Sequence, residues 1–108
     1  MCGQFELTTE FDKLPSILKK DLPKGFEHKY SQQRFIKPAN PVLVVKDEGK
    51  TSSTLMLWGF ISEWAKNPFD PLIPRPFNAR AETVMKKKMF KGSWRHKRCL
   101  LPANGFFE

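Results

Sequence analysis

Two apolar segments separated by a short polar one constrain the fold more than any other feature of the chain. Residues 41–46 read PVLVVK and residues 54–61 read TLMLWGFI. Runs of β-branched and large apolar residues are typical of strands, and the polar segment between them carries an Asp-Glu-Gly-Lys turn signal at 47–50. We therefore predict a β-hairpin whose second strand, being continuously apolar, is buried on both faces.

Two stretches have the spacing of short helices. Residues 9–22 place apolar side chains three or four positions apart, and Pro15 breaks or restarts this helix. Its apolar residues are Phe11, Leu14, Ile17, Leu18 and Leu22. Residues 81–90, AETVMKKKMF, predict one further helix that turns Val84, Met85 and Met89 inward.

Further strands are predicted at both ends of the chain. Residues 4–7 are expected to form a short strand, and residues 99–101 are a third apolar stretch. The turn at 102–105 then leads into Phe106 and Phe107, which we expect in the middle of a strand with partners in the core. Strands dominate and helices are short, so the sequence favours the α+β class.

Length and composition limit the kind of protein. The 108 residues suffice for one domain or part of one, and 40% are hydrophobic, which argues against wholesale disorder. No apolar run reaches the roughly 20 residues of a membrane helix, and the start lacks the features of a signal peptide. Two cysteines do not form a disulfide framework. We expect an intracellular protein without membrane contact, either cytoplasmic and nucleoid-associated or, in a eukaryote, nuclear.

The charge balance favours a polyanionic partner. The net charge is +8, and residues 86–98 hold seven Lys or Arg and no acidic residue, with Phe90 and Trp94 between them. This composition fits a groove that follows phosphates and stacks bases on aromatic rings. Lys86, Arg95 and Arg98 are the candidate contacts. A solvated charged face explains the same run equally well.

Three stretches carry side chains suited to chemistry. Once Met1 is removed, Cys2 would carry a free α-amine and a thiol on adjacent carbons. It could equally be a small, partly buried residue at the start of a strand. Asn78 and Glu82 lie where a loop enters the predicted helix, where such residues commonly act as caps. Glu108 follows two aromatic residues, and it is either a general acid or base or a solvated carboxylate at a sheet edge.

Taken together, four motifs resemble the SRAP family of SOS response-associated peptidases. Residues 1–5, MCGQF, are similar to the family's Met-Cys-Gly-Arg-Phe, and residues 58–65, WGFISEWA, to Trp-Gly-Leu-Ile-Pro-x-Trp-Ala. Residues 78–83 retain Asn-Ala-Arg-x-Glu-Thr intact. Residues 98–108, RCLLPANGFFE, match Arg-Cys-Leu-x-Pro-Ala-x-Gly-Phe-Tyr-Glu, with Phe107 in place of tyrosine.

The resemblance implies both a fold and an activity. The family fold is a curved, barrel-like and mainly antiparallel sheet with short flanking helices. Family members bind single-stranded DNA and crosslink covalently to abasic sites through the processed N-terminal cysteine, forming a thiazolidine. The name also implies that they remove the residues ahead of that cysteine. We thus expect single-stranded DNA containing abasic sites as the partner of a monomeric protein.

The same resemblance implies roles for individual residues. Asn78 would orient Cys2 by hydrogen bonding, and Glu108 would be the acid or base that assists sugar opening and proton transfer. Arg80 would contact the phosphate next to the lesion, because a guanidinium matches phosphate geometry. Trp64 would stack on or wedge between the neighbouring bases.

Neither a metal nor a cofactor is expected. His28 and His96 match no catalytic position of the family, and neither has metal-ligand neighbours in the sequence. Cys99 is expected to be a buried core residue.

Some positions depart from the family pattern. Gln4 replaces an arginine, and residues 34–38 hold only a degraded form of the family's Tyr-Asn-x-x-Pro segment. Family domains are about twice as long, with a catalytic histidine in the further half. We therefore expect residues 1–108 to be the N-terminal portion of a single SRAP domain that has little or no crosslinking activity alone.

Two other functions compete with this interpretation. A glutamine amidotransferase-like hydrolase also begins Met-Cys-Gly and uses the α-amine as a base for its thiol, but the motifs at 78–83 and 98–108 argue against it. A non-catalytic module would bind nucleic acid through residues 86–98 alone.

Overall fold

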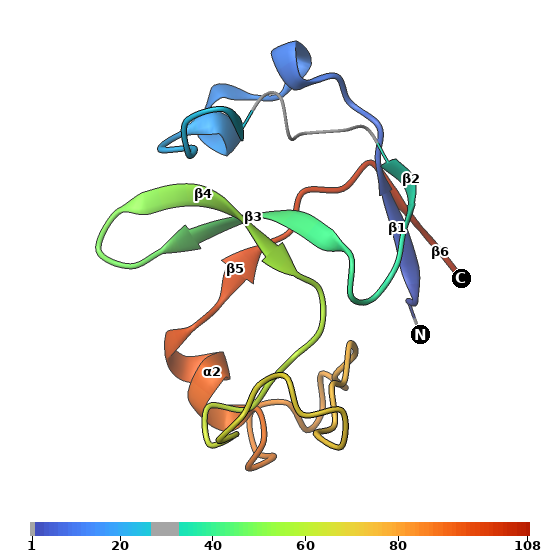
Figure 1. Ribbon diagram of the computed structural model, residues 1–108, viewed down its shortest axis with the longest axis vertical. Helices are drawn as coiled ribbons and strands as arrows, with labels where there is room; N and C mark the ends of the chain where they lie inside the picture. Colours follow the sequence, from blue (N-terminus) through green and yellow to red (C-terminus); the bar gives the residue numbers. More distant parts are fainter. Residues whose placement is uncertain (1, 27–32) are drawn as a thin grey trace.

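Two antiparallel three-stranded sheets form the framework of the molecule. The computed structural model describes residues 2–26 and 33–108 (Figure 1). One sheet has the order β2-β1-β6, with β1 at Gln4–Leu7, β2 at Gln33–Ile36 and β6 at Gly105–Phe107. The other has the order β4-β3-β5, with β3 at Pro41–Asp47, β4 at Thr51–Leu57 and β5 at Cys99–Leu100.

The predicted hairpin is confirmed. Strands β3 and β4 pair continuously from Pro41 opposite Leu57 to Asp47 opposite Thr51. Gly49 lies in the turn with φ of +91°, a conformation that glycine adopts without steric cost. The second strand is shifted from its predicted bounds, because it begins at Thr51 and the chain turns away at Gly59, where φ is +136°.

The predicted burial of β4 on both faces is wrong. Ser53 is buried, and its backbone N–H donates to the carbonyl of Lys20 at 3.0 Å, but Leu55, Met56 and Leu57 are exposed. Strand β4 lies at the edge of its sheet, so it has a neighbouring strand on one side only among the described residues. The apolar side chains at the end of this strand are therefore not covered by other apolar residues among the described ranges.

The predicted helices are shorter than expected. Residues 9–22 form two 3-10 helices, η1 at Phe11–Lys13 and η2 at Ser16–Lys19, interrupted at Pro15 as predicted. The prediction of a helix over 81–90 is wrong, because this segment forms successive turns. The helix α2 spans only Lys91–His96. Met85 is exposed, so the segment has no continuous buried face to stabilise a regular helix.

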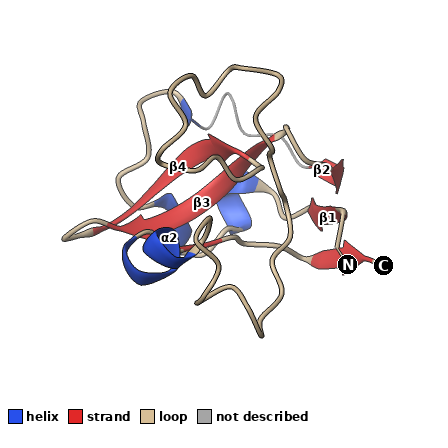
Figure 2. Ribbon diagram, turned by 90° about the horizontal axis from the view of Figure 1, so that it is seen from below, coloured by secondary structure: helices blue, strands red, loops and turns tan. Residues whose placement is uncertain are grey.

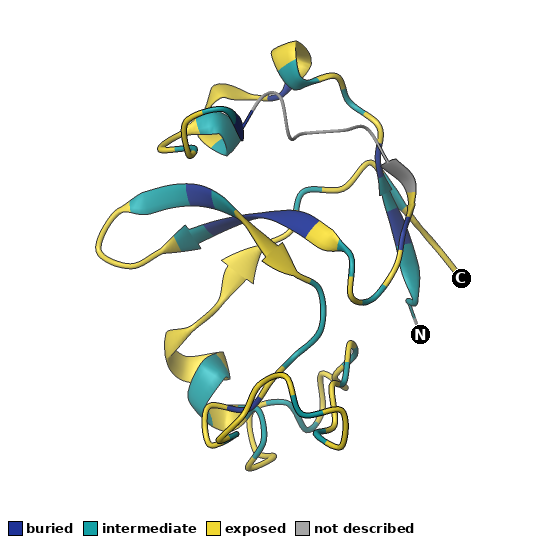
Figure 3. Ribbon diagram, viewed as in Figure 1, coloured by how far each residue is buried: buried dark blue, intermediate teal, exposed yellow. Residues whose placement is uncertain are grey.

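The hydrophobic core lies between the two sheets and the η1–η2 segment (Figures 1 and 3). Strands β1 and β3 supply most of it, and Figure 3 shows their buried positions in dark blue. The buried residues are Phe5, Leu7, Leu14, Phe26, Ile36, Val42, Leu43, Val44 and Val45. Phe5 also packs edge-on against the Trp58 ring, with 5.3 Å between centroids.

Three other expectations need correction. The two sheets do not close into a barrel over residues 2–26 and 33–108, so only a sheet-rich fold is confirmed. Cys99 is exposed rather than buried, since it lies on the edge strand β5. Phe106 and Phe107 do form a strand, but both are exposed because β6 is also an edge.

Over the described ranges the helices are too short or too polar to cross a lipid bilayer.

Candidate active site at the start of strand β1

The pairing of β1 with β6 brings the first and last residues of the chain together. In this antiparallel pair Gln4 lies opposite Phe107 and Glu6 opposite Gly105. Extending the same register by one residue places Glu108 opposite Gly3, next to Cys2. Figure 2 shows the start of β1 beside the end of β6, as does Figure 1. A thiol and a carboxylate from opposite ends of the sequence thus share one end of the sheet.

The Cys2 thiol is half-buried and free of any disulfide. Its Sγ donates to the carbonyl oxygen of Gln4, the first residue of β1, at 3.2 Å. Met1 lies outside the described residues. The carboxylate of Glu108 belongs to an exposed residue, so solvent reaches this end of the site.

Asn78 reaches this region on a segment anchored by aromatic packing. The backbone N–H of Phe60 donates to the carbonyl of Pro76 at 2.8 Å. Phe77 then packs edge-on against Trp58, with 6.2 Å between ring centroids, and its ring lies 3.9 Å from where a Cβ on Gly3 would stand. The residue before Asn78 therefore lies close to the residue after Cys2.

Asn104 fixes the register that places Glu108. Its side-chain oxygen accepts from the backbone N–H of Thr8 at 2.8 Å, and its amide nitrogen donates to the Thr9 hydroxyl at 3.0 Å. Its own backbone N–H donates to the carbonyl of Glu6 at 2.8 Å. These three bonds join the end of β1 to the start of β6. The sequence indicates a turn at this Asn-Gly pair, but nothing local identifies its partners.

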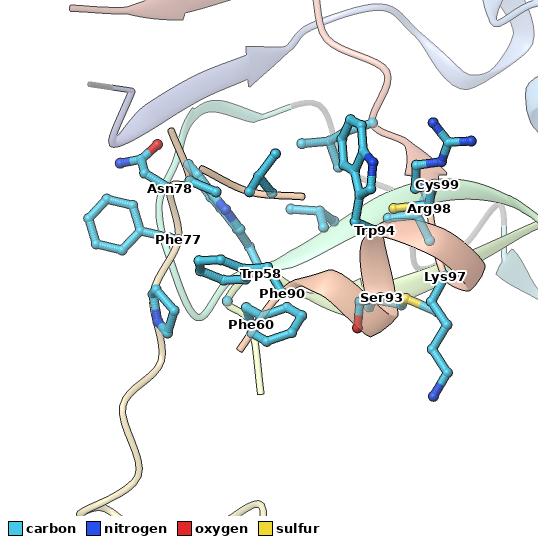
Figure 4. A pocket seen from close by; sticks show the side chains of 18 of the residues that line it. Trp58, Phe60, Phe77, Asn78, Phe90, Ser93, Trp94, Lys97, Arg98 and Cys99 are labelled. Carbon is cyan, nitrogen blue, oxygen red and sulfur yellow. The ribbon is translucent and has the colours of Figure 1, made fainter. Parts of the chain in front are cut away.

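Among the expected DNA-contacting residues, Arg98 lines an open groove whose opposite end is formed by Asn78 and Phe77. Figure 4 shows Asn78 and Phe77 at one end of this groove and Trp94 and Arg98 at the other. The Arg98 guanidinium lies over the Trp94 ring, 5.2 Å from its centroid. Both Trp94 and Arg98 are exposed, so the stacked pair faces solvent.

The loop that carries Trp64 lies beside α2. Glu63 pairs with Lys97 at 3.8 Å, and its Oε1 lies 3.2 Å from where a Cβ on Gly92 would stand. Trp64 itself is 60% exposed. This arrangement places an exposed indole beside the basic helix.

The other predicted DNA contacts are known only by their exposure. Lys86, Arg95 and Arg80 are all exposed to solvent. The carbonyl of Arg80 accepts from the backbone N–H groups of Thr83 and Val84, which orders the first turn after the Asn-Ala-Arg segment.

The comparisons with known proteins agree with these motifs over the whole chain. The family model described as SOS response associated peptidase (SRAP) matches residues 1–108. The chain belongs to the SRAP family. The motifs at 58–65, 78–83 and 98–108 therefore reflect a shared ancestry, and the resemblance is confirmed.

Several SRAP relatives carry names that describe a role in DNA damage. The abasic site processing protein YoqW of Bacillus subtilis (strain 168) is 34% identical over 111 residues, which cover all of this chain and 47% of YoqW. The abasic site processing protein YedK of Escherichia coli (strain K12) is 28% identical and covered to 47%. The abasic site processing protein YMR114C of Saccharomyces cerevisiae is 26% identical and covered to 36%. The chain spans about half the length, or less, of these relatives.

The described residues also bear on metal binding by this SRAP chain. Residues 2–26 and 33–108 contain no group of three or more His, Cys, Asp and Glu side chains that could hold a metal ion. His28 lies outside those ranges.

Removal of the Asn104 side chain should eliminate its hydrogen bonds between the end of β1 and the start of β6. We expect Asn104→Ala to lower the free energy of unfolding by about 1 kcal/mol, because the Thr8 N–H loses its acceptor. Asn104→Asp keeps an oxygen at this place and should lose less. Urea denaturation followed by tryptophan fluorescence measures both. Asn67→Ala is the control, since the Asn67 side chain accepts a local bond from the backbone N–H of Phe69, two residues along the chain. Equal losses in Asn104→Ala and Asn67→Ala would refute the assignment.

Proposed function

We propose that this SRAP chain forms the covalent part of an abasic-site processing protein. Cys2, freed of Met1, would react with the aldehyde of an abasic site in single-stranded DNA and form a thiazolidine. The observation that supports this proposal is the β1–β6 register, in which Gln4 lies opposite Phe107, so that Cys2 and Glu108 adjoin the same end of the sheet. The names of YoqW, YedK and YMR114C support abasic-site processing as the general role.

The reaction needs an amine and a thiol on adjacent carbons. An α-amine has an ordinary pKa of about 8 and is appreciably unprotonated near neutrality. It attacks the aldehyde carbon of the opened sugar, and loss of water leaves a C=N bond. The thiol sulfur then adds to the same carbon, its proton goes to nitrogen, and a five-membered ring closes. No oxidant or reductant is consumed.

The neighbouring side chains supply orientation and proton transfer in this proposal. Asn78 follows Phe77, which packs against Trp58 and lies close to Gly3, and it would hydrogen-bond the terminal residue. Glu108 would deliver a proton to the sugar ring oxygen as it opens and to the hydroxyl that leaves as water. Its exposure lets the proton be replaced from solvent.

The strand would be held by charge and stacking. Trp64 would stack on a base, while Arg80 and Arg98 would contact phosphates. We propose that the protein binds as a monomer. The same Cys2 and Glu108 would remove residues ahead of Cys2, so a precursor with extra N-terminal residues should process itself, and Cys2→Ala should not.

Charge removal from the basic segment should weaken DNA binding in a salt-dependent way. Replacement of Lys86 and Arg95 by alanine should lower affinity for undamaged single-stranded DNA at low salt. The slope of log affinity against log salt should fall by about 0.7 for each phosphate that the variant no longer neutralises. Fluorescence anisotropy at several salt concentrations measures it. Lys20→Ala/Lys24→Ala removes equal charge elsewhere on the exposed surface and should leave the slope unchanged. Equal effects in both double variants would point to net charge alone.

The decisive experiment for the function uses the full-length protein that carries this sequence, with Met1 removed. It is incubated with single-stranded DNA that holds one abasic site, and the products are run on a denaturing gel without reductant. A shifted band is expected, and none with a tetrahydrofuran analogue that has no aldehyde. Glutamine hydrolysis without a shift would establish the amidotransferase alternative. Reversible binding without a shift would establish the non-catalytic module.

A further inference from the structure

Three positions that depart from the SRAP pattern lie together on one face of the β2-β1-β6 sheet. Gln4 stands where the family motif has arginine, Phe107 where it has tyrosine, and Phe35 at the asparagine of the Tyr-Asn-x-x-Pro segment. Together these changes remove one positive charge, one hydroxyl group and one amide group. The three residues are far apart in the sequence, so the sheet alone brings them together.

The strand register places all three side chains on the face that turns away from the hydrophobic core. Gln4 alternates along β1 with the buried Phe5. Phe107 lies directly opposite Gln4. Ile36, which follows Phe35 in β2, lies opposite Phe5 and is buried like it. Phe35 therefore points to the same side of the sheet as Gln4 and Phe107.

The two phenylalanine rings meet over the central strand. Strand β1 lies between β2 and β6 (Figure 1), yet the ring centroids of Phe35 and Phe107 are only 5.5 Å apart, with 32° between the ring planes. This spacing is typical of interacting aromatic pairs. Phe35 is 59% exposed and Phe107 36% exposed, so the pair presents ring surface to solvent.

The aromatic pair adjoins the residue that is proposed to react. Cys2 precedes Gln4 by two residues, and its Sγ donates to the Gln4 carbonyl oxygen at 3.2 Å. Two residues of an extended chain span about 7 Å, which equals about two stacked nucleotides with a rise of about 3.4 Å each. A strand whose abasic sugar is bound to Cys2 would therefore bring a nearby base within reach of the two rings.

We propose that Phe35, Phe107 and Gln4 form a subsite for a purine base within two nucleotides of the abasic site. This subsite rests on the proposed function, because Cys2 has to hold the abasic sugar for the base to reach it. The purine would stack on the exposed ring of Phe35, as bases do on aromatic side chains in single-strand binding proteins. The Gln4 amide would donate to and accept from the base edge, a pairing that glutamine makes best with adenine.

The charges on this face favour a base over a phosphate. A guanidinium at position 4 would be drawn to a phosphate, whereas the neutral Gln4 amide is not. The next residue on the same face is the acidic Glu6, which repels phosphates. The net charge of +8 still attracts the strand to the protein as a whole, so this neutral aromatic surface is left to contact its bases.

The first test measures non-covalent binding, so that it needs no reaction at Cys2. The full-length protein without Met1 is titrated with single-stranded DNA that holds one tetrahydrofuran analogue flanked by each of the four bases in turn. We expect purines on one side of the analogue to bind at least fivefold more tightly than pyrimidines. Phe35→Ala should abolish this preference, and Phe35→Tyr should retain it.

Two results of this titration would overturn the proposal. One is equal affinity for all four neighbours of the analogue. The other is a loss in Phe35→Ala that lowers the melting temperature and weakens binding to every sequence equally, because the aromatic pair would then serve packing alone. Phe69→Ala is the control of the same residue type, since Phe69 is 81% exposed and lies outside this sheet.

Gln4→Arg should exchange the base contact for a phosphate contact. The slope of log affinity against log salt should steepen by about 0.7, the value for one further phosphate on a single strand. The preference for adenine over guanine beside the analogue should disappear. An unchanged slope together with an unchanged preference would refute the role of the Gln4 amide.

A photoreactive purine locates the stacked base directly. 8-Azidoadenine replaces adenine on the preferred side of the analogue, the complex is irradiated, and the adducts are mapped by mass spectrometry. We expect adducts on Phe35 or Phe107, whereas adducts confined to Trp64 or to residues 86–98 would refute the subsite. A purine preference without any crosslink to true abasic DNA would count against the chemistry at Cys2 and leave this subsite standing.

Discussion

Cys2→Ala should abolish the stable crosslink to abasic DNA while leaving a weaker one that a reductant can trap. The variant keeps the α-amine of residue 2 after Met1 removal, so an imine can still form, but no thiol is present to close the ring. An imine hydrolyses readily under denaturing conditions, whereas borohydride reduces it to a stable amine. We expect no shifted band without borohydride and a clear band with it. A denaturing gel of parallel reactions measures both.

Cys99 provides a matched control for this prediction. Both cysteines are free, and Cys99 is the more exposed of the two. Cys99→Ala should crosslink as the unaltered protein does, since its nitrogen is part of a peptide bond and cannot share a ring with the thiol. A stable band that survives Cys2→Ala, or one that disappears in Cys99→Ala, would contradict the proposed chemistry.

Phe5→Ala should have the largest effect on stability. Phe5 is only 4% exposed and contacts the Trp58 ring, and it lies in β1 between the two strands that pair with it. Truncation of a buried phenylalanine removes apolar packing and leaves a cavity, which costs about 3–5 kcal/mol. A loss of this size is comparable to the whole stability of many small domains. Urea denaturation followed by circular dichroism measures the change.

Phe69 supplies the control of the same residue type. It is 81% exposed in the loop after Trp64, so Phe69→Ala should change the free energy of unfolding by less than about 0.5 kcal/mol. The Phe5 change should also slow crosslinking, because Phe5, Trp58 and Phe77 pack in succession toward Asn78. Similar losses in Phe5→Ala and Phe69→Ala would show that the core has been assigned wrongly.

Short sequence patterns correctly predicted the elements that depend mainly on interactions between residues near each other in the sequence. The β3–β4 hairpin follows from two apolar runs and a glycine turn, and the break at Pro15 follows from proline geometry. The helix over 81–90 failed because Met85 is exposed and the segment has no continuous buried face. The burial of Leu55 to Leu57 and of Cys99 failed for a related reason, since both segments lie on edge strands with open faces.

The residues of the candidate site could be predicted from the sequence only through the family motifs. Cys2, Asn78 and Glu108 are far apart in the sequence, and no periodicity connects them. Their placement depends on the β1–β6 register and on the position of Phe77 close to Gly3, which are long-range features. Asn104 was missed as a positioning residue for the same reason, because its partners lie at Glu6, Thr8 and Thr9.

Mapping of the crosslinked peptide tests the central claim most directly. The full-length protein is reacted with abasic single-stranded DNA, digested with nuclease and trypsin, and analysed by tandem mass spectrometry. The proposal predicts that the sugar adduct lies on the peptide from Cys2 to Lys13, that Met1 is absent, and that both nitrogen and sulfur of Cys2 are modified. An adduct on a lysine of residues 86–98, or on a peptide that still carries Met1, would contradict it.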